Sequence, residues 1–247
     1  MDLPPETTDG AGRTSIRPRG RRAHGYQLTD RDIQILRWIA RHGVVTTELV
    51  GRRFFWRPER NTYGKWATYS RLEALTDMRL IIRTKSYGYP LPVLRVTRAG
   101  ARIADAGIRP APLVNSELHH SIALVWLTEY LLRENAGAQL VTERELRAQR
   151  YRERREGDRE LAHGRAPDAL LLLPSGQGRD GESETVAIEL DLSRKDRREM
   201  ENVIRQYDHE HVDRIWWFVR PVRVDRTRAV VRELRAQDRI EVQQWLA

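Results

Sequence analysis

The sequence predicts an α+β protein of two domains, and three observations support this class. The chain has 247 residues and is 40% hydrophobic, enough for two modest cores because a domain usually takes roughly 100 to 200 residues. Apolar residues recur at helical spacing through residues 28–78, whereas apparent strands and helices alternate from residue 117 onward. Charge also divides the chain, with 21 Lys and Arg against 10 Asp and Glu in residues 1–115 and 23 against 25 in the remainder.

The basic excess points to a nucleic-acid partner for the N-terminal half. Arginine far outnumbers lysine, and the planar guanidinium group suits the oxygens of a phosphate. We therefore expect double-stranded DNA as the main partner. High-GC codon usage, which also raises the arginine content, is the alternative explanation.

Composition excludes several other classes. The chain has no cysteine, so disulfides, thiolate metal sites and a cysteine nucleophile are ruled out. Its apolar runs are far shorter than the ~18 residues of a membrane span, and the first residues lack the apolar core of a signal peptide. We expect a cytoplasmic protein with no membrane association.

Residues 1–26 are predicted to be a disordered basic tail. They mix Pro, Gly and Thr with an arginine run and have few large apolar groups, so burial cannot offset the entropy lost on ordering. The tail is either a solvating terminus or an arm that binds phosphates.

Residues 27–104 are predicted to form a winged helix-turn-helix. Apolar spacing indicates helices over about 28–43, 46–54 and 62–78, followed by strands over 80–83 and 93–96. Thr29 or Asp30 caps the first helix, and Gly43 ends it. Trp56 and Trp66 are predicted to be packing residues, with aromatic stacking platforms for bases as the alternative.

The third of these helices is the predicted recognition helix. Helical projection places Leu72, Leu75 and Tyr69 toward the core, Ser70 on the outer face and Arg71 on its flank. The outer face would enter the major groove, with Arg71 as the best candidate for a base or phosphate contact. An ordinary solvated arginine is the alternative. The predicted DNA-binding residues are Arg60, Lys65, Ser70, Arg71, Arg79, Lys85 and Arg95.

A Pro- and Gly-containing linker, residues 105–116, is expected to precede a second domain of residues 117–247. This domain is predicted to be a mixed α/β sheet. Its expected helices are 117–134, 195–211 and 227–237, and its expected strands are 139–142, 168–173, 185–190, 215–219 and 240–245. The charged stretch 144–165 is either an exposed hairpin or helix, or a flap.

Acidic residues at neighbouring strand ends form the candidate active site of this domain. Glu189 and Asp191 are two positions apart on one strand and so share a face, and Asp168, at the start of the adjacent strand, would join them within about 5 to 6 Å. An all-oxygen ligand set favours Mg²⁺ or Mn²⁺. Crowded carboxylates repel one another unless a cation or Lys195 compensates. The alternative is a solvated sheet face on which Lys195 pairs with the acids.

The histidines are weaker candidates. His119 and His120 open the helix at 117–134 without acids at metal-binding spacing. The pattern favours core or capping histidines over zinc ligands.

The order of elements, with Pro167-Asp168 on one strand and Glu189-Leu190-Asp191 on the next, resembles the PD-(D/E)XK nuclease superfamily. In that superfamily an Asp and a Glu, often with an upstream Glu, hold Mg²⁺, and a Lys two residues after the Glu polarises water. The resemblance implies that Asp168 and Glu189 bind the metal and that Glu143 matches the upstream Glu; from the shared strand face, Asp191 or Glu143 would complete the metal's shell. Asp191 occupies the lysine position, and Lys195, four residues further on, would have to reach back to assist the water.

The N-terminal half carries a second resemblance. Residues 69–75, with 80–83 after them, are similar to the recognition helix and first wing strand of winged-helix regulators, and residues 97–100 are similar to the start of their closing helix. Taken whole, residues 28–246 resemble the replication-relaxation family of actinobacterial mobile elements and plasmids.

This family resemblance implies a DNA-binding protein that acts in plasmid replication, relaxation or transfer and nicks or cleaves DNA with Mg²⁺. Its expected partners are double-stranded DNA and plasmid replication or transfer proteins, and a homodimer is left open. The alternative is a catalytically inactive accessory factor or transcriptional regulator, which the missing lysine after Glu189 favours.

Overall fold

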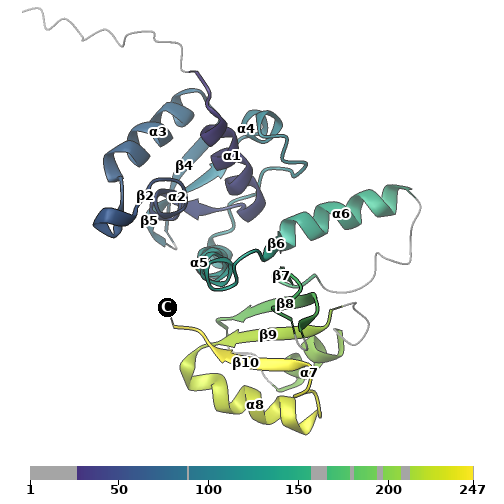
Figure 1. Ribbon diagram of the computed structural model, residues 1–247. Helices are drawn as coiled ribbons and strands as arrows, with labels where there is room; N and C mark the ends of the chain where they lie inside the picture. Colours follow the sequence, from purple (N-terminus) through teal and green to yellow (C-terminus); the bar gives the residue numbers. More distant parts are fainter. Residues whose placement is uncertain are drawn as a thin grey trace, which may run out of the picture.

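A computed structural model describes residues 27–87, 89–156, 166–178, 181–193, 197–206 and 212–246. The class is α+β, as predicted: one lobe joins helices to a small antiparallel sheet, and the other is built on a larger mixed sheet (Figure 1). The predicted basic tail, residues 1–26, and Lys195 lie outside the described residues.

The first lobe packs helices against an antiparallel sheet. Its helices are α1 (Asp30–His42), α2 (Thr47–Phe54), α3 (Lys65–Asp77) and α4 (Arg98–Ile103). The sheet has the order β1-β5-β4 and consists of β1 (Val45–Thr46), β4 (Ile81–Ser86) and β5 (Tyr89–Val96). Fully buried Ile35, Ile39, Leu75, Val93 and Leu94 form the centre of its core.

Helix α1 begins and ends as its sequence indicates. Thr29 and Asp32 form a capping box, in which the Thr29 backbone N–H donates to the Asp32 carboxylate at 2.6 Å. Gly43 ends the helix at φ 80°, a conformation that glycine adopts without strain.

A short hairpin separates α2 from α3 and was not expected. Strands β2 (Trp56–Arg57) and β3 (Thr62–Tyr63) pair antiparallel around a 3₁₀ turn, η1 (Pro58–Arg60). The Tyr63 ring packs so closely on Gly51 that a Cβ there would lie 2.2 Å from it. The prediction that the third helix starts at residue 62 was therefore wrong, because Tyr63 is held in the hairpin and α3 begins at Lys65.

The aromatic residues near α3 are more exposed than predicted. Leu72 and Leu75 are buried, as expected, but Tyr69 is 46% exposed, Trp66 83% and Trp56 41%. Thr68, Leu72 and Leu75 form the buried stripe of α3, and Tyr69 follows Thr68 by about 100° around the helix. The expectation that these aromatic side chains pack in the core was wrong.

The second lobe is built on a mixed sheet, as predicted. The described strands of this lobe pair in the order β10-β9-β8-β7-β6, antiparallel from β6 to β8 and parallel from β8 to β10. They are β6 (Gln139–Thr142), β7 (Ala169–Leu173), β8 (Glu184–Asp191), β9 (Arg214–Val219) and β10 (Ile240–Gln244).

Helices cover both faces of this sheet (Figure 1). Helix α5 (Leu118–Glu134) packs on the face that carries Ile188 and Leu190. Helices α7 (Arg197–Gln206) and α8 (Val224–Glu233) pack on the opposite face, around Trp217. A 3₁₀ turn, η6 (Pro221–Arg223), leads into α8, and another, η2 (Asn115–Glu117), leads into α5.

Helix α5 belongs to both cores. Leu118, Ile122 and Val125 pack with the first lobe, whereas Leu127 and Leu131 pack on the mixed sheet. The Trp38 indole N–H also donates to Glu129 of α5 at 2.9 Å. A boundary at residue 117 therefore assigns to the second domain a helix that also completes the first.

The charged stretch after β6 forms a helix, one of the predicted alternatives. Helix α6 (Glu143–Glu156) projects away from the sheet (Figure 1). The rest of the stretch, residues 157–165, lies outside the described residues.

Candidate functional site

Three predicted acids lie in one row across neighbouring chain segments. The β7–β8 register pairs Ala169 with Ile188, and extending it by one residue places Asp168 opposite Glu189. In the same way, the β6–β7 register pairs Thr142 with Ala169 and places Glu143 next to Asp168, whose carbonyl accepts the Glu143 backbone N–H at 3.2 Å. The predicted convergence of Asp168, Glu189 and Glu143 is thus present in the backbone.

Asp168 is fixed by hydrogen bonding in the middle of this row. Its Oδ2 accepts the Leu190 backbone N–H at 2.8 Å, and its side chain is 12% exposed. Glu189 is buried, with 1% of its surface exposed. Asp168 therefore keeps slightly more exposure than Glu189, and of the two only Asp168 lines the neighbouring cleft.

His120 joins the acids from α5. Its Nε2 lies 3.4 Å from Asp168 Oδ1. The hydrogen bond to Asp168 raises the pKa of His120 above its ordinary value, against the effect of burial, and the charges of Asp168, Glu189 and Glu143 add to the rise. No signal in the sequence points to this histidine, because Asp168, the acid in contact with it, lies on another element and is far from it in the sequence.

Glu143 is partly buried. Burial raises the pKa of Glu143, the charge of Asp168 adds to this, and the Arg147 guanidinium, 2.5 Å away, opposes it. A carboxyl pKa raised by burial first and by a neighbouring acid second is a perturbation found at functional sites, so this cluster is a functional candidate.

Asp191 has other partners, so its predicted role as a metal ligand is not supported. Its Oδ1 accepts the Ser193 backbone N–H and hydroxyl, each at 3.1 Å, and its Oδ2 accepts from the Arg223 guanidinium at 3.3 Å. Asp191 and Arg223 are both buried, so this pair ties the end of β8 to the start of α8.

The acids fit a divalent metal in chemistry but only in part in geometry. Their oxygens are the ligands that Mg²⁺ and Mn²⁺ prefer. Among the described residues, however, no three His, Asp or Glu side chains gather closely enough to hold an ion. Asp168 and Glu189 are the best matched pair, with Glu143 beside Asp168.

A cleft of about 790 Å³ opens in front of Asp168, Glu143 and His120. Arginines line it, but much of their charge is already engaged. Arg41 pairs with Glu145 at 2.7 Å, and Arg144 donates to the Ala40 carbonyl at 3.0 Å. These contacts join α6 to α1 along one side of the cleft.

The predicted DNA-binding residues divide into two groups. Five are exposed on the first lobe: Arg60, Lys65, Ser70, Arg79 and Lys85. The other two are partly buried and engaged by contacts within the protein. Arg95 donates to the Ala111 carbonyl at 2.9 Å, and Arg71 donates to both carboxylate oxygens of Asp32 and to the Gln27 carbonyl.

Arg71 thus braces α3 against α1, and its predicted DNA contact stays a prediction. Asp32 is 1% exposed, so its charge requires a cation. Arg83, which sequence reasoning did not select, is exposed on β4 with its guanidinium 5.5 Å from the Tyr69 ring centroid. Strand alternation gave no signal for it, because Arg83 is two residues after buried Ile81 and so shares its face of the strand.

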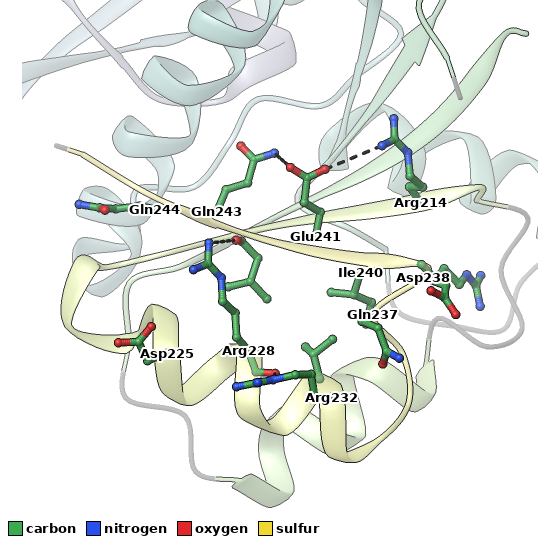
Figure 2. Close-up of a pocket in the computed structure, with 13 residues that line it drawn as sticks. Arg214, Asp225, Arg228, Arg232, Gln237, Asp238, Ile240, Glu241, Gln243 and Gln244 are labelled. Atoms are coloured by element: carbon green, nitrogen blue, oxygen red, sulfur yellow. Dashed lines mark hydrogen bonds and ion pairs between the residues drawn. The ribbon is translucent and has the colours of Figure 1, made fainter. Parts of the chain in front are cut away.

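Figure 2 shows a separate groove, of about 840 Å³, along strand β10 and helix α8. Arg228 donates to the Val242 carbonyl at 3.2 Å, and Glu241 lies between Arg214, 3.8 Å away, and Gln243, 3.0 Å away. No residue of the predicted sites lines this groove.

Comparisons with family models, with curated proteins and with solved structures returned no match. The family resemblance of the sequence thus remains a hypothesis. None of the described helices combines the length and apolar character needed to cross a membrane.

Proposed function

We propose that this chain is a DNA-binding protein whose residues 27–104 act as a winged helix-turn-helix on duplex DNA. The observation that carries this proposal is the outer side of α3. Leu72 and Leu75 are buried on one side, while Lys65, Trp66 and Ser70 are exposed on the other. A helix held on a core with its other face free suits insertion into the major groove.

The neighbouring elements add positive charge to this face. Strand β4 presents exposed Arg83 and Lys85, and Arg60 is exposed in the hairpin that leads into α3. Such cations would contact phosphates and position the duplex, whereas Ser70 and its neighbours on α3 would meet base edges. In this proposal Arg71 does not touch DNA but sets the angle of α3 against α1.

Fluorescence anisotropy with a labelled 30-base-pair duplex tests this proposal. The triple variant Lys65→Ala, Arg83→Ala, Lys85→Ala should bind at least about tenfold more weakly, because each phosphate contact contributes to affinity. Arg226→Ala removes an exposed arginine of α8 and is the matched control. Equal loss in both variants, or none in either, would contradict binding through the first lobe.

A second candidate function, DNA nicking, is favoured by the row of Glu143, Asp168 and Glu189 with His120 beside it. If Mg²⁺ or Mn²⁺ binds, Asp168 and Glu189 would hold it, with Glu143 nearby, and it would polarise a phosphate or a water. The chain's own contribution would be to orient Asp168, through the Leu190 N–H and His120.

Supercoiled plasmid with Mg²⁺ or Mn²⁺ tests the second candidate. Nicking by the wild-type protein that disappears in both Asp168→Asn and Glu189→Gln would support it. Nicking equal in wild type and variants, or absent altogether, leaves a DNA-binding accessory factor or transcriptional regulator. The role in replication, relaxation or transfer, and partners beyond DNA, are proposed from the family resemblance alone.

A further inference from the structure

An exposed tryptophan stands on the helix that is proposed to enter DNA. Trp66, in the first turn of α3, is 83% exposed. Burying such a ring contributes about 2 to 3 kcal/mol, and most of this free energy is not gained in the fold because the ring stays exposed. Two further aromatic residues, Tyr69 and Trp56, are also partly exposed nearby in the sequence.

The Trp66 side chain borders a hollow of about 660 Å³ between α3 and the start of α1. Phe55, with the Arg31 guanidinium 5.3 Å from its ring centroid, lines the same hollow, and so does Ser70. The hollow therefore combines aromatic walls with a hydroxyl group, a lining suited to a flat, partly polar ligand.

The charges around the hollow argue against a phosphate as that ligand. Asp30 and Glu73 line it together with Arg31, and the Asp32 charge is already paired with Arg71. Mixed charges of this kind do not attract an anion strongly. Neutral, planar nucleobases do stack on aromatic side chains, while the exposed Lys65 beside Trp66 can neutralise the adjoining phosphate.

We propose that Trp66 stacks on a nucleobase that has left the duplex, so that the protein prefers DNA with an unpaired base over a continuous duplex. This inference rests on the proposed DNA-binding function and defines its substrate class more closely. Taking a base out of the stack costs energy, and this cost is smallest where the base is already mispaired, damaged or unpaired.

The test compares a continuous duplex with the same duplex containing one bulged 2-aminopurine. Wild-type protein should bind the bulged duplex more tightly and quench its fluorescence, since stacking on an aromatic ring contributes roughly 5- to 150-fold per base. Trp66→Ala should lose both the preference and the quenching, and Trp66→Phe should retain most of each. Tyr130→Ala, which removes a 46% exposed aromatic of α5, is the matched control.

The outcomes of this test distinguish a failure of the stacking role from a failure of the proposed DNA binding. Binding of both duplexes with equal affinity, or a preference that survives in Trp66→Ala, would overturn the stacking role while leaving DNA binding intact. Absence of any DNA binding would instead remove the proposed function. Thermal unfolding should be the same for Trp66→Ala and wild type because the ring is largely exposed. A self-association that only Trp66→Ala abolishes, with unchanged DNA binding, would assign the hollow to a second copy and overturn the proposal.

Discussion

Replacing Arg71 with alanine should destabilise the first lobe rather than remove a base contact. Its guanidinium bonds both oxygens of Asp32 and the Gln27 carbonyl. Leaving a buried carboxylate without its cation costs about 3 to 5 kcal/mol. The Arg71 side chain is 25% exposed, and Thr29 still donates its backbone N–H and hydroxyl to Asp32, each at 2.6 Å. We therefore expect a loss of about 2 to 3 kcal/mol.

The pH dependence of this loss follows from Asp32. Burial alone would raise the pKa of Asp32, but hydrogen bonds from Arg71 and Thr29, with the Arg71 charge, hold it below its ordinary value. A depressed carboxyl pKa stabilises the fold above the unfolded value of about 3.9, and this stability is lost as the pH falls through the folded pKa. The Arg71→Ala penalty should be complete at pH 7 and shrink below about pH 4.

Urea and thermal unfolding measure this effect. At pH 7 the thermal unfolding midpoint of Arg71→Ala should lie about 5 to 10 °C below that of the wild type. The midpoint of Arg226→Ala should equal that of the wild type. Adding Asp32→Asn to Arg71→Ala should restore part of the loss, because the buried charge is then removed. An Arg71→Ala protein with wild-type stability and at least about tenfold weaker DNA binding would refute the bracing role and restore the base contact expected from the sequence.

Three further perturbations test the packing and the pH response. Gly100→Ala should cost at least about 2 kcal/mol in chemical unfolding, because a Cβ would lie 2.1 Å from the Leu80 carbonyl oxygen; wild-type stability would contradict this reasoning. Burial lowers the pKa of His42, so its contribution to stability is full above about pH 6.5 and falls as the solution is acidified, by at most about 2 kcal/mol at pH 5. His42→Gln should flatten this part of the stability profile, and an unchanged profile would exclude His42 as its source. Ile122→Ala should cost about 2 to 4 kcal/mol and lower the unfolding midpoint of both lobes together. Two separated unfolding transitions would contradict an α5 that belongs to both cores.

Periodicity was sufficient to predict most of the regular elements. The apolar spacing around Ile35 and Ile39 and the alternation around Val93 are local signals, and the structure places helix and strand there. The β2–β3 hairpin was not predictable in this way. Its strands are two residues long, and Tyr63 is positioned by contact with Gly51, a tertiary packing that no short window contains.

The carboxylate site was predictable to the extent that it depends on strand register. Asp168 and Glu189 were expected to meet because they flank adjacent strands, and the observed pairing places them opposite each other. The contact of His120 with Asp168 could not be predicted from the sequence, because it depends on how α5 packs on the sheet. Arg223, which engages Asp191, lies beyond two intervening elements for the same reason.

Arg71 shows what helical projection of α3 could not predict. Projection reports which side of a helix a residue occupies but not what the neighbouring element offers. The buried carboxylate of Asp32 lies on α1, and only the packing of α3 against α1 shows that it captures the arginine.

The dependence of duplex affinity on salt tests the central claim most directly. Contacts from Arg60, Lys65, Arg79, Arg83 and Lys85 to phosphates would give a slope of about −4 to −5 for log K against log salt concentration, and removing Lys65, Arg83 and Lys85 together would reduce its magnitude by about 2 to 3. A flat response in the wild-type protein, or the same slope in the triple variant, would contradict DNA binding by the outer face of α3 and β4.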